Sequence, residues 1–230
     1  MKEIDLRLFY VIEDRRLVYL EVPKVASTSI LFTIGQSYKI KFNPTKIHTD
    51  PFWHRLRGTL GKELESYYKF SFVRNPFDRL VSCYKEKVVK PYHNSDLPYW
   101  FNRKHFSLPK NASFPEFVAF AIEIPDHLAD RHFKSQTAIL YQDGTLLVDW
   151  LGRFENLAAD WATFAKRYNY SAHLSHKTSS RDVQRTHQDY RLYYTPELAE
   201  LVYQRYQRDF ELFGYQDAHQ ELLAFLDAQA

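Results

Sequence analysis

Short β-prone runs alternate along the chain with stretches whose apolar residues recur at helical spacing. The runs 17–21 and 68–73 are rich in apolar and aromatic residues and have the length of strands. Residues 29–34 follow the first run and residues 77–88 follow the second, and both stretches have the periodicity of a helix. The pattern therefore predicts two strand–loop–helix units. Pro76, directly after the second run, suits the first turn of its helix.

The second half of the chain continues the alternation. A strand is expected over 146–150, followed by a helix from about Leu157. One long helix is expected from Thr195, as its N-cap, to Gly214, where it stops, and a final amphipathic helix over 216–228. Strands that alternate with helices predict an α/β fold with a central parallel sheet and helices on both faces.

Composition narrows the class of protein. The 230 residues, 45% hydrophobic and 26% charged, suit one soluble domain over residues 1–230, with no internal repeat. A net charge of +3 does not indicate a nucleic-acid binder but is compatible with anionic ligands. Cys83 is the single cysteine, and no apolar run is long enough for a membrane segment, so we expect a cytoplasmic protein. The sequence leaves the oligomeric state open.

The loop in "EVPKVASTSIL" (21–31) joins the first predicted strand to its helix. Such a loop directs backbone N–H groups and the positive end of the helix dipole at one spot, which favours phosphate or sulfate. Lys24 adds a positive charge and residues 27–29 add three hydroxyls. The alternative is a plain connection with polar caps. Because the loop has no glycine and its lysine precedes the turn, it lacks the pattern of a P-loop kinase.

The second loop carries an arginine at its strand end. Arg74 can hold a phosphate through paired hydrogen bonds, with Ser82 two helical turns later donating beside it. Because functional groups collect at the carboxyl ends of parallel strands, Arg74 and Lys24 are expected to converge on one crevice. Arg79 lies between Arg74 and Ser82, and we expect it to be solvated or paired with a neighbouring acid, Asp78 or Glu86.

These motifs resemble a known family. "VPKVASTS" and "FSFVRNPFDRLVSCYKEKV" are similar to the paired nucleotide motifs of carbohydrate sulfotransferases of the chondroitin and dermatan 4-O-sulfotransferase and HNK-1 type. "DRHFKSQ" (130–136), "GRFENLAAD" (152–160) and the predicted 195–214 helix resemble later family segments in the same order, so the resemblance spans about residues 18–215. Animal members carry a membrane anchor and paired cysteines, which this sequence lacks, so it resembles a compact bacterial-type relative.

The resemblance implies a P-loop-like three-layer fold and the donor 3′-phosphoadenosine 5′-phosphosulfate (PAPS). It implies a hydroxyl of a glycan or polysaccharide as acceptor, without a metal, and the histidines and cysteine form no metal-ligand pattern. Lys24 would also neutralise charge on the leaving phosphate oxygen during transfer. By similarity, the first loop wraps the 5′-phosphosulfate through Lys24, Val25, Ala26, Ser27, Thr28 and Ser29.

The other donor contacts implied by the resemblance come from two places. Arg74 and Ser82 match the family positions that hold the 3′-phosphate. A late basic loop lies where related sulfotransferases close over the nucleotide, or else it is an ordinary solvated loop. Its candidate residues are Lys177, Thr178, Ser179 and Arg181.

Sulfuryl transfer also needs a general base, and imidazole titrates near working pH. His48 is the first candidate by position, since it lies between the donor loop and the second strand, where another branch of glycan sulfotransferases keeps its catalytic histidine. His54 is the second candidate and His132 the third, while Glu155 is expected to be structural. The aromatic segments 51–56 and 97–106 suit either a sugar groove or ordinary packing.

Two other functions fit the loops. A kinase would use ATP with magnesium, and a non-catalytic module would bind a nucleotide or a sulfated glycan. The module would need neither Lys24 nor a base.

Overall fold

The computed structural model describes residues 7–41, 43, 47–57, 61–89, 102–103, 106–109, 111–175 and 189–229. The chain forms two compact units. The first, here called the helical unit, comprises Met1–Glu3, Asn75–Ile139 and Gln188–Ala230. The second, the sheet unit, comprises Ile4–Arg74 and Leu140–His187. The prediction of a single domain stays a prediction.

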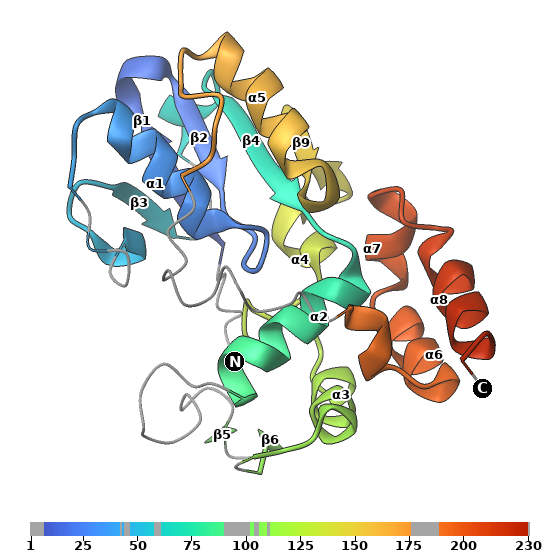
Figure 1. The fold of residues 1–230 in the computed structure, drawn as a ribbon. Helices are drawn as coiled ribbons and strands as arrows, with labels where there is room; N and C mark the ends of the chain where they lie inside the picture. Colours follow the sequence, from blue (N-terminus) through green and yellow to red (C-terminus); the bar gives the residue numbers. More distant parts are fainter. Residues whose placement is uncertain are drawn as a thin grey trace. The chain divides into compact units, whose positions relative to one another are not determined.

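A five-stranded sheet forms the core of the sheet unit (Figure 1), in the order β3-β1-β2-β4-β9. The strands are β1 (Leu8–Ile12), β2 (Leu17–Leu20), β3 (His54–Arg57), β4 (Tyr68–Val73) and β9 (Trp150–Arg153). β4 is parallel to β2 on one side and to β9 on the other. β1 is antiparallel to both β2 and β3. The predicted α/β class with a central parallel sheet is confirmed, and the antiparallel strands extend one edge.

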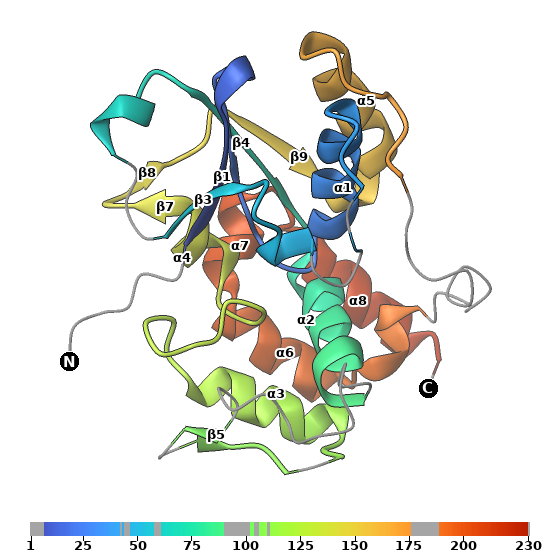
Figure 2. The ribbon, with the colours of Figure 1, turned by 90° about the vertical axis from the view of Figure 1, so that its left-hand side faces the viewer.

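Two helices, α1 (Ser27–Ser37) and α5 (Leu157–Arg167), lie along the same face of this sheet (Figures 1 and 2). Their apolar sides meet the aromatic residues of the strands. The ring of Phe164 on α5 lies 4.1 Å from that of Phe70 on β4, measured between centroids. Gly152 on β9 pairs with Phe72, whose ring would be 2.4 Å from an added Cβ, so any larger residue would force this buried ring to move. The described part of this unit also contains 3-10 turns at Glu13–Arg15, Ile47–Thr49, Lys62–Leu64 and Phe154–Asn156.

The predicted strand over 146–150 is wrong in position. Asp143 and Gly144 both have positive φ, at 50° and 79°, and form a two-residue turn between β7 (Tyr141–Gln142) and β8 (Thr145–Leu146). Leu146, the first residue of the predicted strand, belongs to this hairpin. The sheet strand β9 begins only at Trp150. The carboxylate of the preceding residue, Asp149, accepts a hydrogen bond from the backbone N–H of Lys69 at 2.7 Å.

The helical unit is built mainly from short helices. They are α2 (Pro76–Tyr84), continued by a π-helical turn over Lys85–Val89, α3 (Phe114–Glu123), α4 (Gln136–Leu140), which ends at the unit boundary, α6 (Pro196–Arg205), α7 (Gln207–Leu212) and α8 (Ala218–Asp227). A 3-10 turn over Tyr190–Tyr193 and the strand pair β5 (Asn102–Arg103) and β6 (Phe106–Ser107) also belong here. As expected for a proline in the first turn, Pro76 begins α2, and the Asn75 side chain accepts a hydrogen bond from Phe77 N–H at 3.0 Å.

The predicted helix 195–214 is interrupted at Tyr206. Tyr206 leaves helical geometry, with φ −113° and ψ 21°, and separates α6 from α7. Its hydroxyl donates to the carbonyl of Phe133 at 2.6 Å inside the core. The predicted ends are confirmed, because Thr195 caps α6 through Leu198 N–H and Gly214 has φ 71°. The buried hydrogen bond of Tyr206 thus lies at a break in a segment whose apolar pattern predicts one continuous helix.

The expectation that Arg79 is solvated is wrong as well. Its residue surface is only 3% exposed, and its guanidinium donates to the carbonyls of Lys134, at 2.8 Å, and Arg131, at 3.0 Å. Burial lowers the pKa of Arg79, while the negative charge of Asp209 opposes that shift. Arg79 therefore fastens α2 to the 131–134 turn from inside the helical unit.

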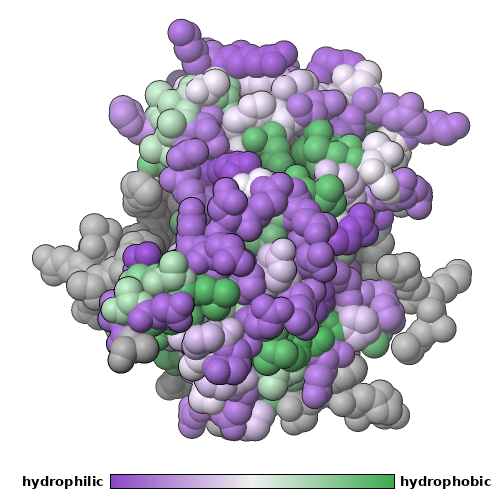
Figure 3. Space-filling model, turned by 90° about the vertical axis from the view of Figure 1, so that its right-hand side faces the viewer, coloured by the Kyte–Doolittle hydropathy of each residue, from purple (hydrophilic) through white to green (hydrophobic). Residues whose placement is uncertain are grey.

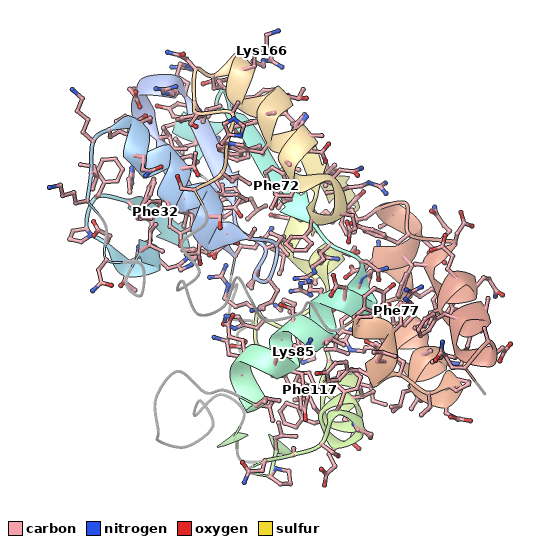
Figure 4. The ribbon with its side chains drawn as sticks, in the orientation of Figure 1. Phe32, Phe72, Phe77, Lys85, Phe117 and Lys166 are labelled. Carbon is pink, nitrogen blue, oxygen red and sulfur yellow. The ribbon has the colours of Figure 1, made fainter. Side chains whose placement is uncertain are left out.

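Large aromatic side chains fill the interior of both units. Figure 4 shows Phe32 and Phe72 in the sheet unit and Phe77 and Phe117 in the helical unit, all buried. The face in Figure 3 is mostly hydrophilic, with apolar residues in separate small groups. Within the described ranges, no helix combines the length and apolar character that crossing a bilayer requires.

Candidate functional site

The loop between β2 and α1 has an unusual backbone. Lys24 and Ala26 have φ values of 74° and 67°, in the left-handed region that glycine ordinarily fills. Each such residue costs about 1 to 2 kcal/mol and is found mainly where the surroundings enforce it, often at binding sites. Val25 between them is fully buried and anchors the loop. Left-handed residues in a turn let successive N–H groups point to one side and form an anion-binding concavity.

The start of α1 continues this site. Ala26 is the N-cap, and its methyl group cannot accept a hydrogen bond from the first-turn N–H groups. The first turn also contains no acidic residue. The helix therefore keeps the positive end of its dipole and its first N–H groups directed at the loop. Backbone groups and Lys24 together make a site suited to an anion.

The three hydroxyls of the loop differ in their surroundings. The Ser27 hydroxyl is buried, receives a hydrogen bond from Tyr19 at 3.1 Å and donates to the carbonyl of Val22 at 2.9 Å. It stabilises the loop, so the contribution of Ser27 to a ligand would come from its backbone N–H. Thr28 Oγ1 lies 3.0 Å from Nε2 of His48, and Ser29 is half-buried.

Arg74 lies at the end of β4, within the sheet unit. Its Nη1 donates to the carbonyl oxygen of Lys24 at 2.9 Å, and its guanidinium carbon lies 3.8 Å from the ring centroid of Phe154. The residue is 6% exposed. The structure thus brings Arg74 and Lys24 together, as the two motifs predict, through the backbone of the loop.

His48 lies on the short turn Ile47–Thr49, next to the loop. Its Nδ1 is 3.1 Å from Oε1 of Glu21 and 3.2 Å from the hydroxyl of Tyr10. Its carbonyl oxygen accepts a hydrogen bond from Arg55 of β3 at 2.5 Å, and Ile47 is fully buried beside it. The imidazole is therefore held between β1, the end of β2 and the first turn of α1.

His54 is placed elsewhere. It lies on the edge strand β3 and pairs with Val11, which in turn pairs with Val18 near the start of β2, away from the loop that follows Leu20. Its Nδ1 is 2.9 Å from Oε1 of Glu13, and its side chain is 53% exposed. The structure does not bring His54 to the donor loop.

The helical unit contains two predicted residues. Ser82 lies half-buried on α2. His132 Nδ1 is 2.6 Å from Oδ1 of Asp130, and burial lowers the pKa of His132 although Asp130 opposes this shift. Burial pushes the pKa of Asp130 upward, but the hydrogen bonds and charge of His132 outweigh it, so that pKa is lowered. The late-loop candidates Lys177, Thr178, Ser179 and Arg181 lie outside the described residues.

Sequence reasoning missed three residues of this arrangement: Glu21, Tyr10 and Phe154. Glu21 does leave a signal, because it is a charged residue at the end of an apolar strand and directly precedes the Pro-Lys motif. Tyr10 and Phe154 leave none, since aromatic residues are common throughout this chain. No group of three or more His, Cys, Asp or Glu side chains that could hold a metal occurs among the residues that the structure describes.

Comparison with known proteins identifies the family. The profile of the sulfotransferase family matches residues 7–216. The chain therefore belongs to the sulfotransferase family, whose donor is PAPS. The match covers both nucleotide motifs and confirms the resemblance seen in the sequence.

Curated relatives are similar over most of the chain. Carbohydrate sulfotransferase 11 of Rattus norvegicus is 27% identical, covering 92% of this chain and 68% of the relative. Carbohydrate sulfotransferase 11 of Danio rerio is 25% identical, with the same shares. Carbohydrate sulfotransferase 10 of Homo sapiens is 24% identical, covering 90% of this chain and 66% of the relative. No solved structure matches this chain.

Proposed function

We propose that this sulfotransferase moves a sulfuryl group from PAPS to a hydroxyl of a carbohydrate, with the loop 22–29 as donor site and His48 as general base. One observation supports this assignment above the others. His48 Nε2 lies 3.0 Å from the hydroxyl of Thr28, inside the loop that the family resemblance assigns to the phosphosulfate. A base beside the donor loop is the arrangement that sulfuryl transfer needs.

The donor site follows from the loop geometry. The N–H groups around Lys24 and Ala26, the uncapped start of α1 and the Lys24 ammonium suit the 5′-phosphosulfate end of PAPS. Val25 and Ser27 are buried, so they would contribute backbone groups, whereas Thr28 and Ser29 would add hydroxyls. The positive groups can stabilise the charge of the leaving phosphate without a metal.

The 3′-phosphate is assigned to Arg74 and Ser82 by similarity. Arg74 has five N–H donors in a planar fork, and one of them holds the carbonyl of Lys24. We assign Lys177, Thr178, Ser179 and Arg181 to the nucleotide by the same resemblance.

The family match extends from residue 7 to residue 216, across both compact units, and we propose that the two form one sulfotransferase domain.

The transfer step uses His48 and Lys24. Nε2 of His48 accepts the proton of the acceptor hydroxyl while that oxygen forms its bond to sulfur. The bond between sulfur and the 5′-phosphate oxygen breaks, and its electron pair stays on the phosphate, where Lys24 and the α1 N-terminus stabilise it. The Thr28 hydroxyl marks a position from which a hydroxyl can give its proton to Nε2.

The carbohydrate acceptor is supported by the names of the relatives, which are carbohydrate sulfotransferases. Of the aromatic segment 51–56, Phe52 is partly exposed and suits a sugar ring, whereas Trp53 is buried against Tyr10 and belongs to the packing. The side chains of segment 97–106 lie outside the described residues. Phe52 is therefore the described aromatic residue we assign to the acceptor side.

Transfer of labelled sulfate from PAPS to a panel of glycans tests the proposal. We expect label on at least one glycan, without added metal, and about 10²-fold slower labelling with His48→Ala under the same conditions. Phenols and steroids serve as competing acceptors, and labelling of these alone would overturn the carbohydrate assignment. Phosphate transfer from ATP with magnesium would indicate the kinase alternative, and tight donor binding without any transfer would indicate a binding module.

A further inference from the structure

A carboxylate lies buried directly before the donor loop. Glu21 is 4% exposed, and its backbone N–H donates to the carbonyl of Leu8 at 2.9 Å, which continues the pairing of β1 and β2. A buried carboxylate is costly unless it is hydrogen-bonded or paired with a cation. The contacts of the Glu21 carboxylate therefore indicate which groups stabilise it in this buried position.

Two partners of the Glu21 carboxylate belong to the His48 site. Oε1 lies 3.1 Å from Nδ1 of His48, and Oε2 accepts the hydroxyl of Tyr10 at 3.4 Å. The Tyr10 oxygen is itself 3.2 Å from Nδ1 of His48. Tyr10 is fully buried, with its ring stacked on Tyr19 and edge-on to Trp53, so its hydroxyl has a fixed position. Nδ1 thus faces two fixed oxygen atoms.

We propose that Glu21 is a positioning residue for sulfuryl transfer: it fixes the tautomer of His48 so that Nδ1 carries the proton and Nε2 presents its lone pair to the donor loop. The inference rests on the proposed role of His48 as base. A carboxylate can only accept from Nδ1, so its neighbour must be the N–H nitrogen. The other ring nitrogen, Nε2, is the one beside Thr28.

The same carboxylate acts during turnover. When Nε2 takes the proton of the acceptor hydroxyl, the imidazole becomes a cation, and the negative charge of Glu21 stabilises it at 3.1 Å. Among the described residues, the other polar groups facing His48 are the hydroxyls of Tyr10 and Thr28, together with the guanidinium of Arg55, which binds the backbone carbonyl. Of these groups and Glu21, only Glu21 carries a negative charge.

Glu21→Gln tests the proposal, because it keeps the size of the side chain and removes the charge. We expect turnover to fall on the order of 10²-fold, less than the roughly 10⁴-fold of the matching change in a serine protease triad, because Tyr10 still accepts from Nδ1. Adenosine 3′,5′-bisphosphate should bind within about twofold of the wild-type affinity.

Glu13→Gln is the matched control. Glu13 forms a second carboxylate–histidine pair in the described part of the sheet unit, with His54, away from the donor loop. Its replacement should leave turnover unchanged. Tyr10→Phe is the second test variant should Glu21→Gln fold poorly, and we expect it to lower turnover about threefold to tenfold, as loss of one hydrogen bond would.

The double variant separates this inference from the base assignment. If Glu21 acts through His48, Glu21→Gln should lower turnover no further in a His48→Ala background, since residues that act as a unit are not additive. An equal loss in both backgrounds overturns the role of Glu21 while leaving His48 as base. Normal turnover of His48→Ala overturns the base assignment itself.

NMR of the histidine ring nitrogens provides a readout that does not depend on activity. At pH above the imidazole titration, the His48 signals should show the proton on Nδ1 in the wild type and a mixture of tautomers in Glu21→Gln. A wild-type proton on Nε2 would contradict the proposal directly.

Discussion

Nη1 of Arg74 donates a hydrogen bond to the carbonyl oxygen of Lys24 across 2.9 Å and 50 residues of sequence. Within the sheet unit, this bond joins the end of β4 to the donor loop. Arg74 is itself held by the ring of Phe154, from the segment that joins β9 to α5. A residue that the resemblance assigns to the 3′-phosphate thus also stabilises the strained backbone of the phosphosulfate loop.

Nucleotide selectivity is the first prediction. Adenosine 3′,5′-bisphosphate should bind without added metal, and AMP should bind more weakly, because AMP lacks the phosphate assigned to Arg74 and Ser82. Isothermal calorimetry in the presence of a chelator measures both affinities. Equal affinities would remove the 3′-phosphate from the proposed site.

Arg74→Ala separates the two roles of the arginine. We expect the binding free energy of adenosine 3′,5′-bisphosphate to weaken by about 2 to 4 kcal/mol, as for loss of a charged hydrogen-bonding partner. The binding of AMP should weaken less, because AMP loses only the contribution that Arg74 makes by stabilising the loop. Arg167→Ala, an exposed arginine on α5, is the control. Equal weakening for both nucleotides would assign Arg74 to the loop and not to the 3′-phosphate.

Replacing Lys24 by alanine or by glycine tests its positive charge through turnover and its left-handed backbone conformation through stability. Lys24→Ala and Lys24→Gly both remove the ammonium, so both should lose turnover through poorer stabilisation of the leaving phosphate. With φ at 74°, the glycine variant should be more stable than the alanine variant by about 0.5 to 1 kcal/mol in urea denaturation. Were the alanine variant the more stable of the two, the left-handed conformation of Lys24 would be in doubt.

The three candidate histidines should respond differently to replacement by alanine. His48→Ala should lower turnover about 10²-fold or more, with little change in donor affinity, because a general base is lost. His54→Ala should have a small effect, since His54 lies away from the loop. His132→Ala reports on the helical unit, and a loss there larger than at His48 would transfer the base assignment to His132.

Acid stability of the helical unit should depend on Asp126. Its carboxylate accepts from Ser135 N–H at 3.0 Å and from Arg205 at 2.7 Å. Burial raises the pKa of Asp126, but these partners outweigh it, so the folded pKa lies below the usual value of about 3.9. The stabilisation is therefore complete above pH of about 4 and is lost as pH falls through the folded pKa.

Asp126→Asn should destabilise the protein by about 2 kcal/mol at pH 7, and by progressively less below pH of about 4. Thermal or urea unfolding between pH 3 and pH 7 measures the difference. Asp227→Asn, an exposed acid on α8, should show no such loss. A difference that stays constant with pH would show that Asp126 does not act through its charge.

Local sequence by itself determined the strand and helix boundaries around the two motifs. β4 matches its prediction at both ends because aromatic and apolar residues occupy it and Asn75 and Pro76 stop it. β2 ends one residue before the predicted limit, and α1 begins two residues earlier than predicted. These elements follow from side-chain pattern and caps, which act over a few residues.

Tertiary structure decided what the local pattern could not. The Tyr206 hydroxyl and the Asp143–Gly144 turn interrupted elements that look continuous in sequence, and Arg79 became an internal hydrogen-bond donor. The contact between Glu21 and His48 joins residues 27 positions apart, and the left-handed Lys24 is held by Arg74 from another strand. Burial and hydrogen bonding between distant segments fix such features, because a buried polar group needs a partner wherever the chain provides one.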